Sequence, residues 1–334
     1  MFENAQTIKE VKQLSRPETV FALAHLPGGR RLAFGGSDFG VYDVDFAQEK
    51  PEPRKLGAHE SYVTGVAVAG RTVVSGGYDG RLIWWDLESS DGPMIRNVEA
   101  HTKWVRDVVS TADGALVASV ADDMVCRVWD ARTGEKRLEL HGHESQTPHH
   151  FPSMLYACAF SPDGRYLATG DKVGHIVVWD VSDGTQAAVL ESPTMYTWDP
   201  KQRRHSIGGI RSLAFSPDGN GLAVGGMGQV GNIDHLEGSS LIEIFDWRAA
   251  KRTHEFPGGA QKGLVERLVF LPDGNRLLAV GGANDGFLTL LDLNAKSVLL
   301  SEKAPSHVND AVLGDTPEVL FSCGQGRIVA HELK

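Results

Sequence analysis

Residues 59–86, HESYVTGVAVAGRTVVSGGYDGRLIWWD, contain three short apolar runs separated by turns and end in Trp85-Asp86. Short apolar runs bounded by Gly- and Asp-rich turns are typical of antiparallel strands. The same ending, an aromatic or apolar residue followed by Asp, recurs in steps of 43, 44, 50, 66 and 46 residues, and a degenerate last copy places His331 at the position of Trp85. Copies at such a period indicate one repeat array rather than two unrelated domains. The pairs of an aromatic or apolar residue with Asp, apart from the degenerate last copy, are Tyr42-Asp43, Trp85-Asp86, Trp129-Asp130, Trp179-Asp180, Phe245-Asp246 and Leu291-Asp292.

A second motif lies inside the copies, where an apolar run, an SPDG turn and another apolar run follow one another. It is clearest in residues 158–171, CAFSPDGRYLATGD, and in residues 213–226, LAFSPDGNGLAVGG. Pro fixes φ, Asp bonds to its own backbone and Gly accepts positive φ, so the turn suits two antiparallel strands. Each copy is therefore predicted to hold three inner strands, with a fourth strand after the aromatic-Asp pair.

Across nearly its full length the sequence resembles the WD40-repeat β-propeller family. In that family a His, a Ser or Thr, an Asp and a Trp of one copy form a hydrogen-bonded set. The second and third copies match it in full, the fourth copy has Val173 in place of the Asp, and the fifth copy lacks the His and the Ser. The complete sets are His59, Ser75, Asp79 and Trp85, and His101, Ser119, Asp123 and Trp129.

The resemblance implies a single all-β domain over residues 1–334, a seven-bladed WD40 β-propeller with four-stranded antiparallel blades. The N-terminal segment, residues 5–14, is expected to complete the last blade and to close the ring, which removes an exposed sheet edge. The spacing of Ile8, Val11 and Leu14 is not a clean period of two, so a short N-terminal helix stays open as an alternative.

Composition narrows the classes of partner and the compartment. The formal net charge of -10 opposes indiscriminate binding to nucleic acid, whose phosphates require a basic face. No apolar run is long enough to span a bilayer, and the N-terminal residues do not form a secretory signal, so we expect a cytoplasmic protein without a membrane partner. Cys126, Cys158 and Cys323 lie far apart without metal-type spacing and are expected to be buried free thiols.

Three insertions exceed what the scaffold needs: residues 141–154, 192–208 and 226–239. In a propeller, the connections between blades and the turns between second and third strands emerge on one face, here called the top face. The insertions are therefore expected to meet above the fourth and fifth copies and to bind a partner, although Trp198 could instead anchor its loop to the scaffold. Their candidate binding residues are His149, His150, Tyr196, Trp198, Asp199, Arg203, Arg204, His205, Asn232, Asp234, His235 and Glu237.

A second candidate surface is the channel mouth, the ring of residues that enter the first strand of each copy. Two arginines, two aromatic rings and one carboxylate in this ring could hold a peptide carboxylate or an Arg side chain, or they could satisfy one another. The ring positions are Phe21, Thr64, Arg106, Tyr156, Arg211, Glu266 and Asn309.

The sequence contains no nucleophile elbow, phosphate loop or zinc-protease motif in a credible context, and the mouth holds one carboxylate where acid–base catalysis needs a positioned pair. We therefore predict a non-catalytic scaffold without cofactor or metal, which binds a protein or peptide, in particular an acidic segment. The alternative is a propeller, with or without enzymatic activity, that binds a small ligand or a metal through the His-rich insertions.

Overall fold

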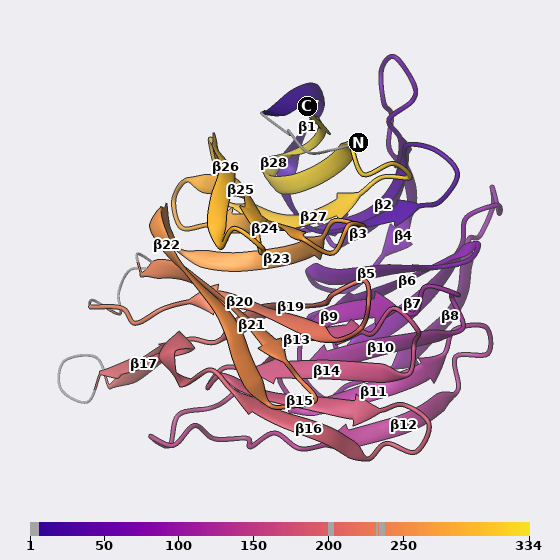
Figure 1. Cartoon of the computed structure of the whole chain (residues 1–334). Helices are drawn as coiled ribbons and strands as arrows, with labels where there is room; N and C mark the ends of the chain where they lie inside the picture. Colours follow the sequence, from indigo (N-terminus) through magenta and orange to yellow (C-terminus); the bar gives the residue numbers. More distant parts are fainter. Residues whose placement is uncertain (1–6, 200–203, 232, 234–237) are drawn as a thin grey trace.

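The computed structural model describes residues 7–199, 204–231, 233 and 238–334, and in this part of the chain the architecture is all-β. The strands form antiparallel sheets that follow one another in chain order (Figure 1), and the backbone N–H of Thr7 donates to the carbonyl of Lys334 at 2.8 Å. The strands nearest the axis contact one another in a closed ring, in the order β1, β5, β9, β13, β19, β23, β27 and again β1. The molecule is therefore a β-propeller.

Five of the sheets are four-stranded blades in which consecutive strands pair side by side. The first blade contains β5 (Val63–Ala69), β6 (Thr72–Gly77), β7 (Arg81–Asp86) and β8 (Met94–Glu99). The second contains β9 (Val105–Ser110), β10 (Leu116–Ala121), β11 (Val125–Asp130) and β12 (Lys136–His141), and the third contains β13 (Leu155–Phe160), β14 (Tyr166–Asp171), β15 (His175–Asp180) and β16 (Gln186–Glu191). The fourth contains β19 (Ile210–Phe215), β20 (Gly221–Met227), β21 (Ser239–Asp246) and β22 (Lys251–Lys262), and the fifth contains β23 (Leu264–Phe270), β24 (Arg276–Gly282), β25 (Gly286–Asp292) and β26 (Ser297–Ala304).

The sixth blade sheet has six strands and joins the two ends of the chain. Its β1 pairs with the C-terminal strand from Ile8 opposite Leu333 to Thr19 opposite Gln325, and then with β2 from Val20 to Leu26. The order across this sheet is β27 (Val308–Leu313), β28 (Val319–Leu333), β1 (Ile8–Leu26), β2 (Arg31–Gly36), β3 (Gly40–Asp45) and β4 (Arg54–Ala58).

The prediction of seven blades is wrong, because the described residues form six blade sheets. The sequence assigns the first and last copies to separate blades, but β1 and β28 are continuous strands that hold both copies in one sheet. No Gly-type turn interrupts the chain between Ser15 and Thr19, so β1 passes from one partner to the other through a register shift. The all-β class and the four-stranded antiparallel blades are confirmed.

The N-terminal segment forms a strand from Ile8 onward, and the helix alternative is wrong for these residues. The part of the predicted closing segment at residues 5–6 lies outside the described residues. No helix in the described part of the chain is long and apolar enough to cross a membrane. The three cysteines are buried and free.

The hydrogen-bonded sets expected from the resemblance fix the strands within the blades. In the second copy, Trp85 Nε1 donates to Ser75 Oγ at 2.8 Å, and the same hydroxyl lies 2.8 Å from His59 Nε2. Asp79 accepts from His59 Nδ1 at 3.0 Å. Each of these polar groups is buried or half-buried and finds its partner inside the blade, which is the condition for burying it at low cost.

The fourth copy keeps such a set although its sequence lacks an Asp at residue 173. His143 Nδ1 lies 2.9 Å from Asp171, and His143 Nε2 lies 2.8 Å from Thr169 Oγ1. Trp179 Nε1 donates to the same Thr169 hydroxyl at 2.9 Å. Asp171 therefore supplies the carboxylate from the end of β14, two residues earlier than in the second copy.

Candidate binding site

The seven predicted ring positions line one cavity of about 280 Å³ at the channel mouth. Each of them lies on one of the strands that surround the axis. Six stand near the first residue of their strand, and Phe21 stands near the first residue of the part of β1 that pairs with β2. Side chains alternate between the two faces of a strand, so residues at matching positions point toward the same space. The same cavity is also lined by Tyr78, Asp107, Leu264 and Arg267.

Arg106 is held by an internal partner. Its Nε and Nη2 donate to the two carboxylate oxygens of Asp122, each at 2.7 Å, and its Nη1 donates to the Tyr78 hydroxyl at 2.7 Å. Burial disfavours the charge, but the bidentate bond to Asp122 outweighs burial and raises the pKa of Arg106. This guanidinium is therefore largely neutralised by its own blade.

Glu266 is also paired, with His307 Nε2 at 3.1 Å. Burial would raise the pKa of Glu266, yet His307 and then the positive charge of Arg211 lower it below its ordinary value. The pKa of His307 is raised, because the carboxylate outweighs the effect of burial. The pair carries little net charge when His307 is protonated.

A third pairing closes the floor of the cavity. Arg267 Nε donates to Asp310 at 2.6 Å, and Arg267 Nη2 lies 3.7 Å from Asp107. These residues come from β23, β27 and β9, so the guanidinium reaches across the channel between two buried carboxylates. The charge of Arg267 is thus balanced from within the molecule.

Arg211 differs from the other two arginines. Its guanidinium carbon lies 3.6 Å from the centre of the Tyr156 ring. Its Nε is buried and has no hydrogen-bond partner, and no carboxylate of the described residues forms an ion pair with it. Buried N–H groups are nearly always bonded, so this donor is one of the few unsatisfied polar atoms among the described residues.

A second cation, which the sequence analysis missed, lies beside Arg211. Lys172 is buried at the start of the β14–β15 turn, and its ammonium group donates to the carbonyl of Pro152 at 3.3 Å. Burial, and then the charges of Arg211 and Arg106, lower the pKa of Lys172. Like charges raise the energy of the ammonium ion in this way only when they are close. This side of the mouth therefore has excess positive charge.

An exposed row of aromatic rings runs from the first copy to Arg106. Phe39 and Tyr62 lie 5.7 Å apart between ring centres, Tyr62 and Tyr78 lie 5.8 Å apart, and Tyr78 stacks on Trp104 at 4.4 Å. Trp104 is 49% exposed and Tyr62 is 42% exposed. Large rings at a surface bury much area when a partner covers them, and they are common among residues that dominate binding.

The three insertions meet, as their place in the strand order predicted. After a short 3-10 turn, η1 (Pro193–Met195), the second insertion forms a hairpin of β17 (Tyr196–Asp199) and β18 (His205–Gly208). His149 of the first insertion stacks on Trp198 at 3.6 Å between ring centres, and the backbone N–H of Val230 in the third insertion donates to Thr197 at 3.1 Å.

Within these insertions Trp198 is 39% exposed, whereas Tyr196 of the same strand is buried. His150 and Arg204 adopt positive φ of 62° and 49°, and Arg204 and His205 are exposed. Among the described residues no group of three His, Cys, Asp or Glu side chains could hold a metal ion. The candidates Arg203, Asn232, Asp234, His235 and Glu237 lie outside the described residues.

The residues that the sequence analysis missed carry a readable signal. Tyr78 belongs to the turn between a second and a third strand, and Tyr62 and Trp104 each stand directly before a first strand. Connections between blades and turns between second and third strands emerge on the top face, so these rings are expected there as well. Lys172 occupies the position of Tyr78 in its own copy, so the same alignment could have found it.

Comparison with known proteins is consistent with this architecture. The family model for the WD domain, G-beta repeat, matches residues 51–86, 92–130, 134–180 and 199–230. The chain is 25% identical to Telomerase protein component 1 of Rattus norvegicus over 282 residues, which cover 83% of this chain and 9% of that protein. It is 29% identical to Nuclear distribution protein PAC1 of Arthroderma otae over 225 residues, 58% of this chain and 44% of the relative.

A third relative, Protein HIR1 of Cryptococcus neoformans, is 27% identical over 231 residues, 61% of this chain and 24% of that protein. The chain thus spans less than half the length of these relatives. The matched repeats, the blade sheets and the His–Ser–Asp–Trp sets agree with one another, and the chain belongs to the WD40-repeat family.

Proposed function

We propose that this protein is a non-catalytic interaction scaffold that binds an acidic segment of a partner protein at the channel mouth. The observation that carries the proposal is the Arg211 guanidinium, which stacks on Tyr156 while its buried Nε has no hydrogen-bond partner among the described residues. The other two arginines of the mouth are bonded to carboxylates of the chain itself.

An Asp or Glu side chain, or a C-terminal carboxylate, matches this site chemically. The planar guanidinium offers parallel N–H donors to two carboxylate oxygens, and stacking on Tyr156 fixes its orientation before the partner arrives. Lys172 adds positive charge from the neighbouring turn. Because the cation is already oriented, less conformational entropy is lost on binding.

The size of the mouth favours a side chain over a whole small molecule. The cavity of about 280 Å³ lies at the lower edge of the range of ligand pockets, roughly 300–1,000 Å³. The rest of the partner segment would lie on the surrounding top face. There the row from Phe39 to Trp104 adjoins Arg106, and the first insertion reaches Lys172 through the carbonyl of Pro152.

The pairings within the mouth support a non-catalytic role. Asp122 is engaged by Arg106 and Glu266 by His307, so neither carboxylate is poised as a free base beside a second acid.

A cytoplasmic location is part of this proposal. The rat relative is named as a protein component, and we propose by analogy that this chain is part of an assembly.

The test is selection of peptides from a random phage-displayed library on the wild-type protein, followed by affinity measurement with Arg211→Gln. Selected peptides should be rich in Asp and Glu, and their Kd should rise about tenfold or more in the variant, as expected for loss of a charged hydrogen bond of about 1.5–3 kcal/mol.

Arg248→Gln is the matched control. Arg248 also stacks on an aromatic ring, with its guanidinium carbon 4.2 Å from Trp247, but it lies beside the SPDG turn on the opposite face. Its substitution should leave peptide affinity unchanged. Peptides without carboxylates, or equal affinities for wild type and Arg211→Gln, would overturn the proposal.

A further inference from the structure

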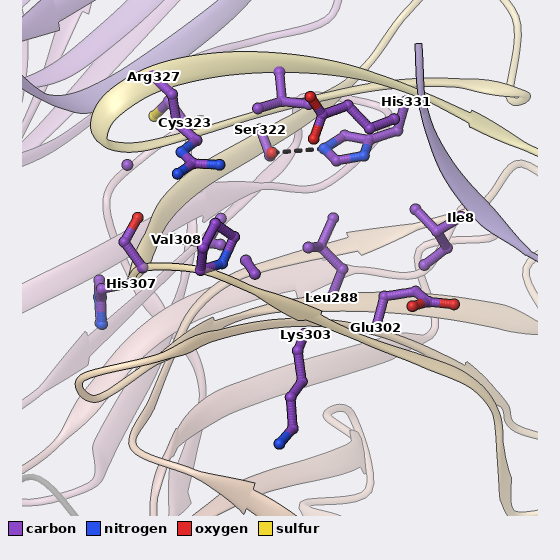
Figure 2. Close-up of a pocket in the computed structure, with 16 residues that line it drawn as sticks. Ile8, Leu288, Glu302, Lys303, His307, Val308, Ser322, Cys323, Arg327 and His331 are labelled. Carbon is purple, nitrogen blue, oxygen red and sulfur yellow. Dashed lines mark hydrogen bonds between the residues drawn. The ribbon is translucent and has the colours of Figure 1, made fainter. Parts of the chain in front are cut away.

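A separate cavity of about 120 Å³ lies between the fifth blade and the part of the six-stranded sheet formed by β27, β28 and β1. In Figure 2 the Ser322–His331 hydrogen bond lies on one side of it, with Leu288 and Val308 on the other. Its inner wall is buried and largely apolar, with Ile8, Leu288, Val308, Cys323 and Val329. Glu10, Glu302, Lys303 and Pro305 at the rim are exposed, so the cavity opens to the surface.

The cavity exists because the last copy carries smaller groups at two positions of the hydrogen-bonded set. His59 stands four residues before Val63, the first residue of β5, and Ala304 stands four residues before Val308, the first residue of β27. His331 occupies the position of Trp85. At the first of these positions the methyl group of Ala304 therefore stands in place of an imidazole, and at the second the imidazole of His331 stands in place of an indole.

The serine of the set remains. Ser75 Oγ is bonded to both rings of the second copy, whereas Ser322 Oγ has His331 Nε2, at 2.8 Å, as its side-chain partner among the described residues. Burial lowers the pKa of His331 to about 4, so the imidazole is neutral near pH 7. The pocket thus presents one uncharged hydroxyl–imidazole pair beside its apolar wall, and Arg327 of the same strand also lines it.

We propose that this pocket binds one aromatic side chain, Phe or Tyr, of the same partner segment whose carboxylate reaches Arg211, an inference that rests on the proposed function. An apolar protein cavity of about 150 Å³ holds benzene, so this cavity of about 120 Å³, which also opens to the surface, matches a single ring better than an indole. Val308, Leu288 and Val329 supply the apolar contacts, and the sulfur of Cys323 packs well against an aromatic edge.

The pocket and the channel mouth are neighbours. His307 lines the pocket, Glu266 lines the mouth, and the two side chains are bonded at 3.1 Å. This ion pair therefore forms a shared wall, and a short extended segment can place its carboxylate on one side and its ring on the other.

The first experiment examines the pocket without any peptide. Titration of the whole protein with p-cresol, a single-ring probe, should shift the methyl resonances of Leu288, Val308 and Val329 in a saturable manner. Ala304→Leu, which fills the pocket, should abolish these shifts. Val298→Leu, at an exposed position on the same strand, should not affect them. Unsaturable or absent shifts in the wild type would overturn the pocket assignment.

His331→Trp provides a second way to fill the pocket if Ala304→Leu fails to fold, because it restores the residue that the second, third and fourth copies carry. Folding of either variant is checked by its melting temperature and circular dichroism before titration.

The second experiment joins the pocket to the partner. In a peptide selected on the wild type, replacement of its aromatic residue by Ala should weaken binding about tenfold in the wild type and should have no further effect in the filled variant. An equal loss in both proteins would refute the inference while leaving the Arg211 result intact. Equal affinities for wild type and Arg211→Gln would instead refute the proposed function, whatever p-cresol does.

Discussion

Replacement of Trp129 by Ala removes the indole of the hydrogen-bonded His–Ser–Asp–Trp set in the third copy. Trp129 is 4% exposed, its Nε1 donates to Ser119 Oγ at 3.0 Å, and its ring contacts Trp84 edge-on at 6.4 Å between centres. Truncation of a buried Trp costs about 3–5 kcal/mol through lost burial and the cavity that remains. Loss of a donor to the buried hydroxyl adds about 1 kcal/mol.

We therefore expect the free energy of unfolding to fall by about 4–6 kcal/mol. At roughly 2 °C per kcal/mol for a chain of this size, Tm should fall by about 8–12 °C. Urea unfolding followed by circular dichroism measures the first quantity, and calorimetry measures the second. Trp104→Ala is the matched control, because Trp104 is 49% exposed and should change stability by less than about 1 kcal/mol. A loss below about 2 kcal/mol for Trp129→Ala would refute the structural role of the set.

Three further predictions concern the insertions, the last copy and the cysteines. Trp198→Ala should lower the free energy of unfolding by less than about 1 kcal/mol, since the ring is 39% exposed, and unfolding of this variant would show that Trp198 anchors its loop to the scaffold. The pKa of His331 is lowered from 6.5 to about 4, so between these pH values the unfolded chain binds a proton that the folded chain does not, and stability falls as the solution is acidified. His331→Phe should remove this dependence, at most about 3 kcal/mol, from pH-dependent urea unfolding, and identical pH slopes for both proteins would contradict the assignment. Burial raises the pKa of the thiols of Cys126, Cys158 and Cys323, so a thiol reagent should label them only after denaturant is added; labelling of the native protein would contradict their burial.

The sequence was sufficient for features that depend on spacing within one copy. The residue pairs around Trp85 and Trp129 predicted the hydrogen-bonded sets, because the strand register determines which positions meet. The ring positions at the channel mouth followed from the same alignment, and all of them line one cavity.

Features that depend on how strands continue were not predictable in this way. The blade count failed because β1 runs unbroken from β28 to β2, and repeat spacing does not show where a strand changes partner. Asp171 could replace the missing Asp in the fourth copy because a carboxylate two residues earlier can still reach His143. The last copy shows the opposite case, in which substitution of two rings leaves an open cavity.

The sequence predicted which residues meet at the channel mouth but not which of their charges are neutralised by other residues. Spacing brought Arg106, Arg211 and Glu266 to one mouth, yet their charge balance depends on Asp122, His307 and Lys172, which come from turns and connections outside the ring. Only the side-chain geometry distinguishes the unbonded Arg211 from the paired Arg106.

Whether Arg211 receives the partner's carboxylate can be tested on the side-chain N–H resonance of its Nε, recorded in isotope-labelled protein while an acidic peptide from the phage selection is added. We expect a resonance without hydrogen-bond character in the free protein, which then shifts downfield and becomes protected from exchange in proportion to bound peptide. A peptide that saturates the protein while this resonance stays unchanged would contradict binding of the carboxylate by Arg211.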